Sequence, residues 1–223
     1  MNNIAKLQQV LGIKFNNPKL LVEALTHPSY ANENNCPHNQ RLEFLGDAVL
    51  ELAMSTYLYN KYKSFDEGDM SKRRAQAVCE EALVIYSEKF NLSQYLLLGH
   101  GEEIKGGRNR ASLIADAFEA ILGAIYLDQG YDAAFGVFNR LILPFIEEVD
   151  IIQDYKTKLQ ELVRTDRMSL SYEIINETGP AHDKTFEAVV KMENGITMGY
   201  GIGKTKKEAE QNAAKEALKK CYK

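Results

Sequence analysis

Hydrophobic positions recur at helical spacing through the first two thirds of the chain. Apolar residues at intervals of three and four positions are typical of amphipathic helices, and no convincing strand alternation occurs before residue 150. A proline after Asn17 marks the start of one of these helices. The pattern predicts helices over Ile4–Leu11, Pro18–Ala24, Asn39–Tyr62, Ser71–Cys79, Glu80–Phe90, Ser112–Asp128 and Tyr131–Val149.

The pattern changes near Asp150. Three later segments alternate apolar and polar residues, as strands with one solvated face do, and a Glu-Asn-Gly turn between the last two indicates a hairpin. The elements expected here are a helix at Tyr155–Thr165, strands at Leu170–Asn176, Thr185–Glu193 and Ile196–Gly201, and a closing helix at Lys206–Lys219. We therefore predict an all-α domain over residues 1–149, a linker over 150–153 and a small α+β (α-β-β-β-α) domain over 154–223.

Composition narrows the class of protein. The chain has 223 residues, of which 45% are hydrophobic and 26% are charged, and it contains no apolar run long enough to span a membrane. The first residues lack the basic and apolar segments of a secretory signal, and the three cysteines are isolated and odd in number. These features predict a cytoplasmic protein with neither a membrane anchor nor a disulfide framework.

The net charge of −4 argues against a simple nucleic-acid binder, but it is unevenly distributed. Residues 1–150 carry a net charge of −6, residues 151–223 carry +2, and the last twenty residues alone carry +4. The chain is therefore acidic in its helical part and locally basic at its end.

Two of the apolar helices carry acids where a core helix would ordinarily carry none. Glu43 and Asp47 are four residues apart, and Asp116 and Glu119 are three apart, so each pair shares one face of its helix. A buried carboxylate without a partner is strongly unfavourable. The four acids therefore need protons, basic partners or a cation.

The simplest explanation is that these acids cap helices or pair with basic residues, and for any single acid that explanation is favoured. The available partners are Arg41, Lys72, Arg73, Arg74, Arg108 and Arg110. Two acidic pairs on two apolar helices instead favour a hard divalent ion, for which Mg²⁺ fits best and Mn²⁺ is a plausible substitute. Such an ion suits phosphoryl transfer, with Asp47 or a metal-bound hydroxide orienting or deprotonating the attacking water.

The residues around these acids resemble the ribonuclease III family. The segment Gln-Arg-Leu-Glu-Phe-Leu-Gly-Asp-Ala-Val-Leu at 40–50 is similar to its highly specific signature, and 66–74 and 106–119 resemble two further blocks. The resemblance covers the full length of the chain. It implies a divalent-metal endonuclease that cuts double-stranded RNA, leaves 5′-phosphate and 3′-hydroxyl ends with short 3′ overhangs, and processes ribosomal and other RNA precursors.

The resemblance also implies roles for single residues. Glu43, Asp116 and Glu119 match the metal ligands of the family, Asp47 matches a catalytic position, and Glu119 is both ligand and catalytic. Glu67 matches an acid near the scissile phosphate.

Gln40 departs from the family pattern, because bacterial members commonly carry an acid at that place. An amide cannot take up charge, so we expect no ionic role for Gln40, while the core activity is retained. Arg108 and Arg110 precede the second acidic helix in a glycine-rich basic run. They could contact a phosphate beside the metal or simply balance the acids, and the sequence favours neither alternative.

Phe44 points away from the face that carries Glu43. For most phenylalanines this would indicate core packing, but in the family the equivalent aromatic packs across a twofold dimer interface. A homodimer is also expected from the substrate, because the two antiparallel strands of a duplex are most simply cut by two sites related by C2 symmetry.

The second domain resembles a double-stranded-RNA-binding domain, which reads the shape of A-form duplexes more than their sequence. Lys204, Lys206 and Lys207 open its last helix, where phosphates would neutralise them; the simpler alternative is a solvated basic turn. The family match assigns the RNA-contacting positions to Thr157, Gln160, Glu161, His182, Lys204, Lys206 and Lys207.

Three other functions are alternatives to cleavage of double-stranded RNA. Gly199–Thr205 is similar to a nucleotide-binding P-loop. The motif needs a glycine five residues before Gly203, but this chain has Met198 there, so no nucleotide cofactor is expected. A protein that binds duplex RNA without cutting it would have no need of the four acids. A metal phosphohydrolase of small molecules would turn over nucleotides in the absence of duplex.

Overall fold

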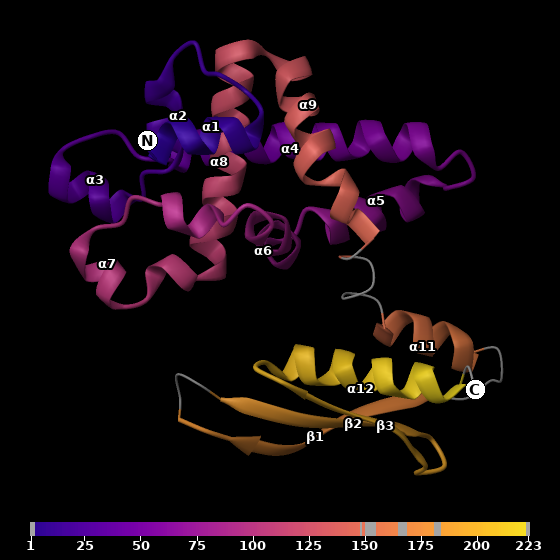
Figure 1. Cartoon of the computed structure of the whole chain (residues 1–223). Coiled ribbons are helices and arrows are strands. Elements are labelled where there is room, and N and C mark those ends of the chain that lie inside the picture. The colour runs from indigo at the N-terminus through magenta and orange to yellow at the C-terminus, as the bar shows by residue number, and fades with distance from the viewer. Residues whose placement is uncertain (1–2, 148, 150–154, 165–168, 181–183, 222–223) are drawn as a thin grey trace. The chain divides into compact units, whose positions relative to one another are not determined.

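A computed structural model of the chain describes residues 3–147, 149, 155–164, 169–180 and 184–221 (Figure 1). It divides into two compact units, Met1–Val149 and Asp150–Lys223. Among the described residues each unit has its own hydrophobic core. The predicted linker, residues 150–153, lies outside the described residues.

The described part of the first unit is built from helices. They are α1 (Asn3–Leu11), α2 (Pro18–Ala24), α3 (Pro28–Asn34), α4 (Gln40–Lys61), α5 (Glu67–Ala77), α6 (Glu80–Glu88), α7 (His100–Ile104), α8 (Ala111–Gln129) and α9 (Tyr131–Leu141). Short 3₁₀ turns lie at Leu92–Tyr95, Gly107–Asn109 and Leu143–Phe145. The all-α prediction for this unit is confirmed.

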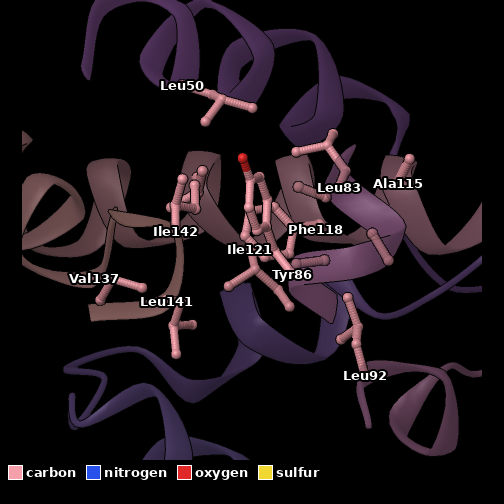
Figure 2. Packing of buried hydrophobic residues seen from close by; sticks show 14 of the residues in the cluster. Leu50, Leu83, Tyr86, Leu92, Ala115, Phe118, Ile121, Val137, Leu141 and Ile142 are labelled. Carbon is pink, nitrogen blue, oxygen red and sulfur yellow. The ribbon is translucent and has the colours of Figure 1, made fainter. Parts of the chain in front are cut away.

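The core of this unit surrounds the apolar helix α8. Figure 2 shows the ring of Tyr86 from α6 among side chains of α8, with Leu50 of α4 and Val137 of α9 on other sides. The Tyr86 hydroxyl donates to the carbonyl of Ala77 at 3.2 Å, so burial leaves it satisfied. Phe118 packs against the same ring with centroids 6.5 Å apart. This packing holds α8 in the centre of the unit.

Two helix boundaries differ by several residues from the sequence predictions. The helix predicted over Tyr131–Val149 ends at Leu141, because Pro144 has no N–H to continue the α-helical hydrogen bonds, and the chain goes on in the 3₁₀ turn Leu143–Phe145. The helix α5 begins at Glu67 rather than Ser71, because the side chain of Asp66 accepts from the backbone N–H of Asp69 at 2.8 Å and caps it.

The short helices α3 and α7 were not predicted from the hydrophobic pattern. His27 caps α3 by accepting from the N–H of Ser29, and Pro28 occupies its first position. The helix α7 has only five residues and no buried one, so it carries no hydrophobic periodicity. Local capping therefore marks α3, whereas the first N–H of α7, at His100, donates to the carboxylate of the distant Glu33 at 2.9 Å.

The second unit is a three-stranded antiparallel sheet with two helices. Its elements are α11 (Tyr155–Arg164), β1 (Leu170–Thr178), β2 (Thr185–Met192), β3 (Thr197–Gly203) and α12 (Lys206–Cys221), and the strand order is β1-β2-β3. The predicted α-β-β-β-α order is confirmed. Glycines of β3 let α12 lie against the sheet, since a Cβ at Gly199 or Gly201 would meet its backbone.

Within the described part of the chain, no helix combines the length and the apolar character needed to cross a membrane.

Candidate functional site

The acidic segments meet where α4 and α8 cross in the first unit (Figure 1). A Cβ added at Gly46 of α4 would lie less than 3.0 Å from the carbonyl oxygen of Glu119, and one at Gly123 of α8 would lie equally close to the carbonyl of Leu42. Glycine inside a helix costs about 1 kcal/mol relative to alanine. Both glycines are therefore explained by close backbone contact, which brings the acid-bearing turns together.

The four acids on these turns act on one another electrostatically. Burial, together with smaller contributions from the charges of Asp47, Asp116 and Glu43, raises the pKa of Glu119 to about 8. Burial also raises the pKa of Asp116 to about 6, with further contributions from Glu43 and Glu80. The pKa of Glu43 is raised by burial and by Asp47.

The structure thus brings Glu43, Asp47, Asp116 and Glu119 into one site. Among the residues that the structure describes, no lysine or arginine forms an ion pair with any of the four. Ion pairs with lysine or arginine therefore do not account for these four acids within the described residues. Excess negative charge remains at the site, where it favours either protons or a cation.

Oxygen donors of this kind suit a hard divalent cation. Glu43 and Glu119 are half-buried, as is Asp116, and Asp47 is exposed at the edge of the site. In the described part of the chain, however, no three acid, histidine or cysteine side chains converge as they would around a bound metal. The donor chemistry fits Mg²⁺, and the ligand set remains a prediction.

Glu67 lies apart from these couplings. It stands at the start of α5, where its carboxylate accepts from the Ser71 hydroxyl at 2.9 Å. It lines a groove with Ser55 and Tyr59 of α4 and with Arg74. Ser55 and Tyr59 lie on α4 after Asp47, so Glu67 lies beside a later part of that helix than the one that carries Glu43 and Asp47.

Arg108 and Arg110 are both engaged with neighbouring acids. Arg108 donates to both carboxylate oxygens of Glu103 and to the carbonyl of Ser93 at 2.6–2.8 Å. Arg110 forms an ion pair with Glu102 at 2.9 Å. The two arginines thus pair with Glu103 and Glu102 and not with the four acids of the site, and a contact with phosphate remains a prediction.

Phe44 is 82% exposed, which excludes the core-packing explanation within a single chain. It lines an open groove together with Gln40, His38, Leu20 and Leu127. Aromatic side chains are enriched at protein interfaces, and Phe44 is accessible for such a contact. Gln40 is exposed in the same groove, so no buried charge is missing at that position.

In the second unit the basic start of α12 is held by reciprocal hydrogen bonds. The N–H of Glu208 donates to the Thr205 hydroxyl at 3.1 Å, and the Glu208 carboxylate accepts from the N–H of Lys204 at 2.6 Å. This arrangement is similar to a capping box, except that the carboxylate accepts from the residue before the N-cap. Lys206 is exposed, with its ammonium 5.8 Å from the centroid of the Phe186 ring.

The remaining predicted contacts lie on α11 or outside the described residues. Thr157 is half-buried and Gln160 is exposed, three positions apart on one side of α11. His182 lies outside the described residues, and so do the side chains of Glu161 and Lys207.

Sequence reasoning missed Glu80, the first residue of α6, whose charge acts on Asp116. An acid in the first turn of a helix looks like ordinary dipole compensation, so the sequence offered no signal for this proximity. Gly46 and Gly123 were also missed. Their signal was available, because both interrupt apolar helices without marking an end.

Each of the two units matches a known protein family. A ribonuclease-III-like family model matches residues 17–146, and a double-stranded RNA binding motif matches residues 155–221. Ribonuclease 3 of Listeria monocytogenes is 50% identical, over 99% of this chain and 98% of that protein. Ribonuclease 3 of Bacillus cytotoxicus is also 50% identical, over 96% of this chain and 89% of that protein.

The chain is also similar to a solved structure. It is the nuclease domain of ribonuclease III from Campylobacter jejuni, described as flexible in a region involved in dimer formation. It is 42% identical with a TM-score of 0.60, and the match covers 62% of this chain and 95% of that one. Matching family models, near full-length relatives and a shared nuclease fold together show that the chain belongs to the ribonuclease III family of double-stranded-RNA endoribonucleases.

Proposed function

We propose that this endoribonuclease is a homodimer that depends on Mg²⁺. In this proposal it cleaves both strands of an RNA duplex and leaves 5′-phosphate and 3′-hydroxyl ends with short 3′ overhangs. Its natural substrates would be precursors of ribosomal, messenger and transfer RNA. The cytoplasm is the proposed setting, in keeping with cysteines that are all free.

The acid site is the observation that supports metal dependence. Four carboxylates share a partly buried site without a described basic partner, and the pKa of Glu119 is raised to about 8. Such a site favours a divalent cation over separate side-chain charges. Glu43, Asp116 and Glu119 would hold the ion, and Mn²⁺ would replace Mg²⁺ with the same oxygen donors.

The bound ion would supply neutralisation of charge that builds on the phosphate during hydrolysis. The protein itself would supply the proton chemistry and the orientation. Asp47 is the exposed member of the four, so its carboxylate can reach a water and orient it or accept its proton. The half-buried position of Glu119 would restrict the movement of its carboxyl by packing, as a ligand site requires.

The second unit would bind the duplex. Lys204 and Lys206 stand at the capped start of α12, where ammonium groups and helix amides would face phosphates together. Thr157 and Gln160 of α11 offer hydroxyl and amide groups for contacts with 2′-hydroxyls. His182, Glu161 and Lys207 belong to the same proposal by family match alone.

The cleavage test uses the full chain with a long RNA duplex in Mg²⁺, in Mn²⁺ and in EDTA. We expect short duplex products with either metal and intact RNA in EDTA. Glu119→Gln should abolish cutting while binding persists, because the amide cannot serve as an anionic ligand. Sequencing of the products reads the chemistry of the ends and the length of the overhang.

The matched control is Glu88→Gln, an exposed glutamate at the end of α6, which should cut normally. Undiminished cutting by Glu119→Gln, or products in EDTA, would contradict the metal proposal. Tight binding with no products under any metal condition would instead indicate a protein that only binds duplex RNA.

A further inference from the structure

Polar contacts join the first turn of α11 to α12, and they involve residues that are not among the proposed RNA contacts. The ammonium of Lys156 forms an ion pair with the carboxylate of Glu210 at 2.7 Å. The backbone N–H of Lys156 donates to the side-chain oxygen of Gln211 at 3.1 Å. The helix α12 thus supplies both a counterion and a cap to the neighbouring helix, whose first amides otherwise lack partners.

The ion pair lies on an aromatic ring. The Lys156 ammonium is 4.3 Å from the centroid of the Tyr172 ring on β1, and the exposed fractions of the Lys156 and Glu210 side chains are 33% and 24%. Burial, with a smaller contribution from Glu210, raises the pKa of Tyr172 to about 12. The ion pair is therefore partly shielded from water, and a cation–π contact and an ion pair are stronger there than at a fully open surface.

The apolar contact between α11 and α12 does little to fix how α11 is rotated. Leu159 and Val163 of α11 share a core with Ala214 and Leu218 of α12, and other core positions of α12 are alanines too. Alanine side chains form shallow ridges, so they restrain rotation and sliding of a packed helix less than large side chains do. Tyr155 also packs against this core, with the Lys215 ammonium 5.2 Å from its ring centroid, and the polar contacts at Lys156 add a directional restraint at the same end of α11.

Lys156 adjoins the side of α11 proposed to contact RNA. Thr157 is the next residue and Gln160 follows one turn later, so any rotation of the first turn moves both side chains. Polar readers of 2′-hydroxyls need placement within hydrogen-bond distance, whereas phosphate contacts by flexible lysines tolerate displacement.

We propose that the Lys156–Glu210 ion pair has a positioning role. The Lys156 ammonium also contacts the Tyr172 ring, and the backbone N–H of Lys156 donates to Gln211. The ion pair fixes the rotation of α11 on α12 and so holds Thr157 and Gln160 for contact with RNA 2′-hydroxyls. The inference rests on the proposed RNA-binding role of the second unit, and it assigns to this pair the preference for RNA over DNA duplexes rather than overall affinity.

The test compares full-length variants for binding to RNA and DNA duplexes of one sequence, in EDTA to prevent cutting. Lys156→Met keeps an apolar stem on the ring and removes one positive charge, and Glu210→Gln removes one negative charge. Because their net charges change in opposite directions, a purely electrostatic effect would shift their affinities oppositely. We expect both to lose RNA affinity by about tenfold, about 1.4 kcal/mol, while DNA affinity changes little.

Two controls separate positioning from folding and from charge. Lys156→Arg can keep the ion pair and should restore most of the RNA preference. Lys220→Met removes a lysine from the exposed Lys220–Glu216 pair on α12 and should leave the preference unchanged. Circular dichroism and the thermal midpoint establish that each variant is folded, and Glu210→Gln serves if Lys156→Met does not fold.

Unchanged RNA preference in the folded variants overturns the proposal. A parallel loss of RNA and DNA affinity also overturns it, because that result indicates general weakening. Failure of the unaltered chain to prefer RNA duplex would refute the proposed binding role itself, which distinguishes the two failures.

Discussion

Glu119 is a half-buried carboxyl with three other acids around it. Burial and the charges of Asp47, Asp116 and Glu43 raise its pKa to about 8, so without a cation it carries a proton at neutral pH. A proton and a divalent ion compete for the same oxygens, and cation binding would release the proton. The site is thus unfavourable for four isolated negative charges.

The stability of the metal-free protein should depend on pH through this residue. Glu119 ionises near 8 in the folded chain and near its ordinary value of 4.5 when unfolded. Between these values the unfolded chain binds fewer protons, so stability falls as pH rises. We expect the thermal midpoint in EDTA to decrease from about pH 5 to about pH 8, with a smaller decrease in Glu119→Gln.

The control for this measurement is Glu88→Gln, whose pH dependence should match that of the unaltered chain. Asp116 contributes in the same direction over a lower range, up to a pKa of about 6. Equal slopes in Glu119→Gln and the unaltered chain between about pH 6 and pH 8 would show that Glu119 does not titrate as described.

At the scale of elements, the site depends on how closely α4 and α8 approach. Gly46 and Gly123 contact the backbone of the opposite helix, and a side chain at either position would push the helices apart. The acids are carried on these same turns. The distance between the helices therefore sets the distance between the two acidic pairs.

Gly46→Ala should disturb both stability and activity. The new methyl group would overlap the backbone at Glu119, and such overpacking costs about 1–3 kcal/mol. We expect a lower midpoint in urea unfolding and a larger loss of cleavage than the stability change alone explains, because the acids separate.

Gly136→Ala on α9 is the matched control. A Cβ there meets nothing within 4 Å, so the substitution should stabilise the helix by about 0.5–1 kcal/mol and leave cleavage unchanged. If Gly46→Ala behaves like Gly136→Ala, the close crossing does not position the acids.

At the scale of the whole molecule, chemistry and substrate binding reside in units with separate cores. Removal of residues 154–223 deletes the basic start of α12 and leaves the acid site intact. We expect weaker duplex binding, a smaller dependence of binding on salt, and residual cleavage at low salt. Binding and cleavage titrated against salt concentration for the truncated and full chains make the measurement.

Retained full-strength binding by the truncated chain would contradict the assignment of substrate binding to the second unit. Complete loss of cleavage at every salt concentration would show that the helical unit does not act on its own.

Dimerisation belongs to the same scale. Phe44 is 82% exposed in the single chain, so Phe44→Ala removes little from its core. We expect light scattering to show a shift from dimer to monomer and a lower rate of double-strand cutting. Ile104→Ala, at a side chain 72% exposed on α7, should remain dimeric. A dimeric Phe44→Ala variant would exclude Phe44 as an anchor of the interface.

Much of this protein follows from its sequence because the relevant signals are local. Hydrophobic periodicity, capping residues and turn glycines predicted the long helices, the three strands and the α-β-β-β-α order. The signature around Glu43 and Asp47 identified the family, and the acid spacing identified which side chains share a helix face. Periodicity could not predict α7, which buries no residue, or the early end of α9.

Tertiary structure decided which helices meet and what each charge faces. The contact of Gly46 with Glu119, the charge of Glu80 near Asp116 and the tie of Lys156 to Glu210 each join residues distant along the chain. It also placed Arg108 and Arg110 against Glu103 and Glu102, and left Glu67 in another groove. Sequence spacing fixes neighbours only within one element, whereas pKa values and ion pairs depend on distances in space, which packing alone sets.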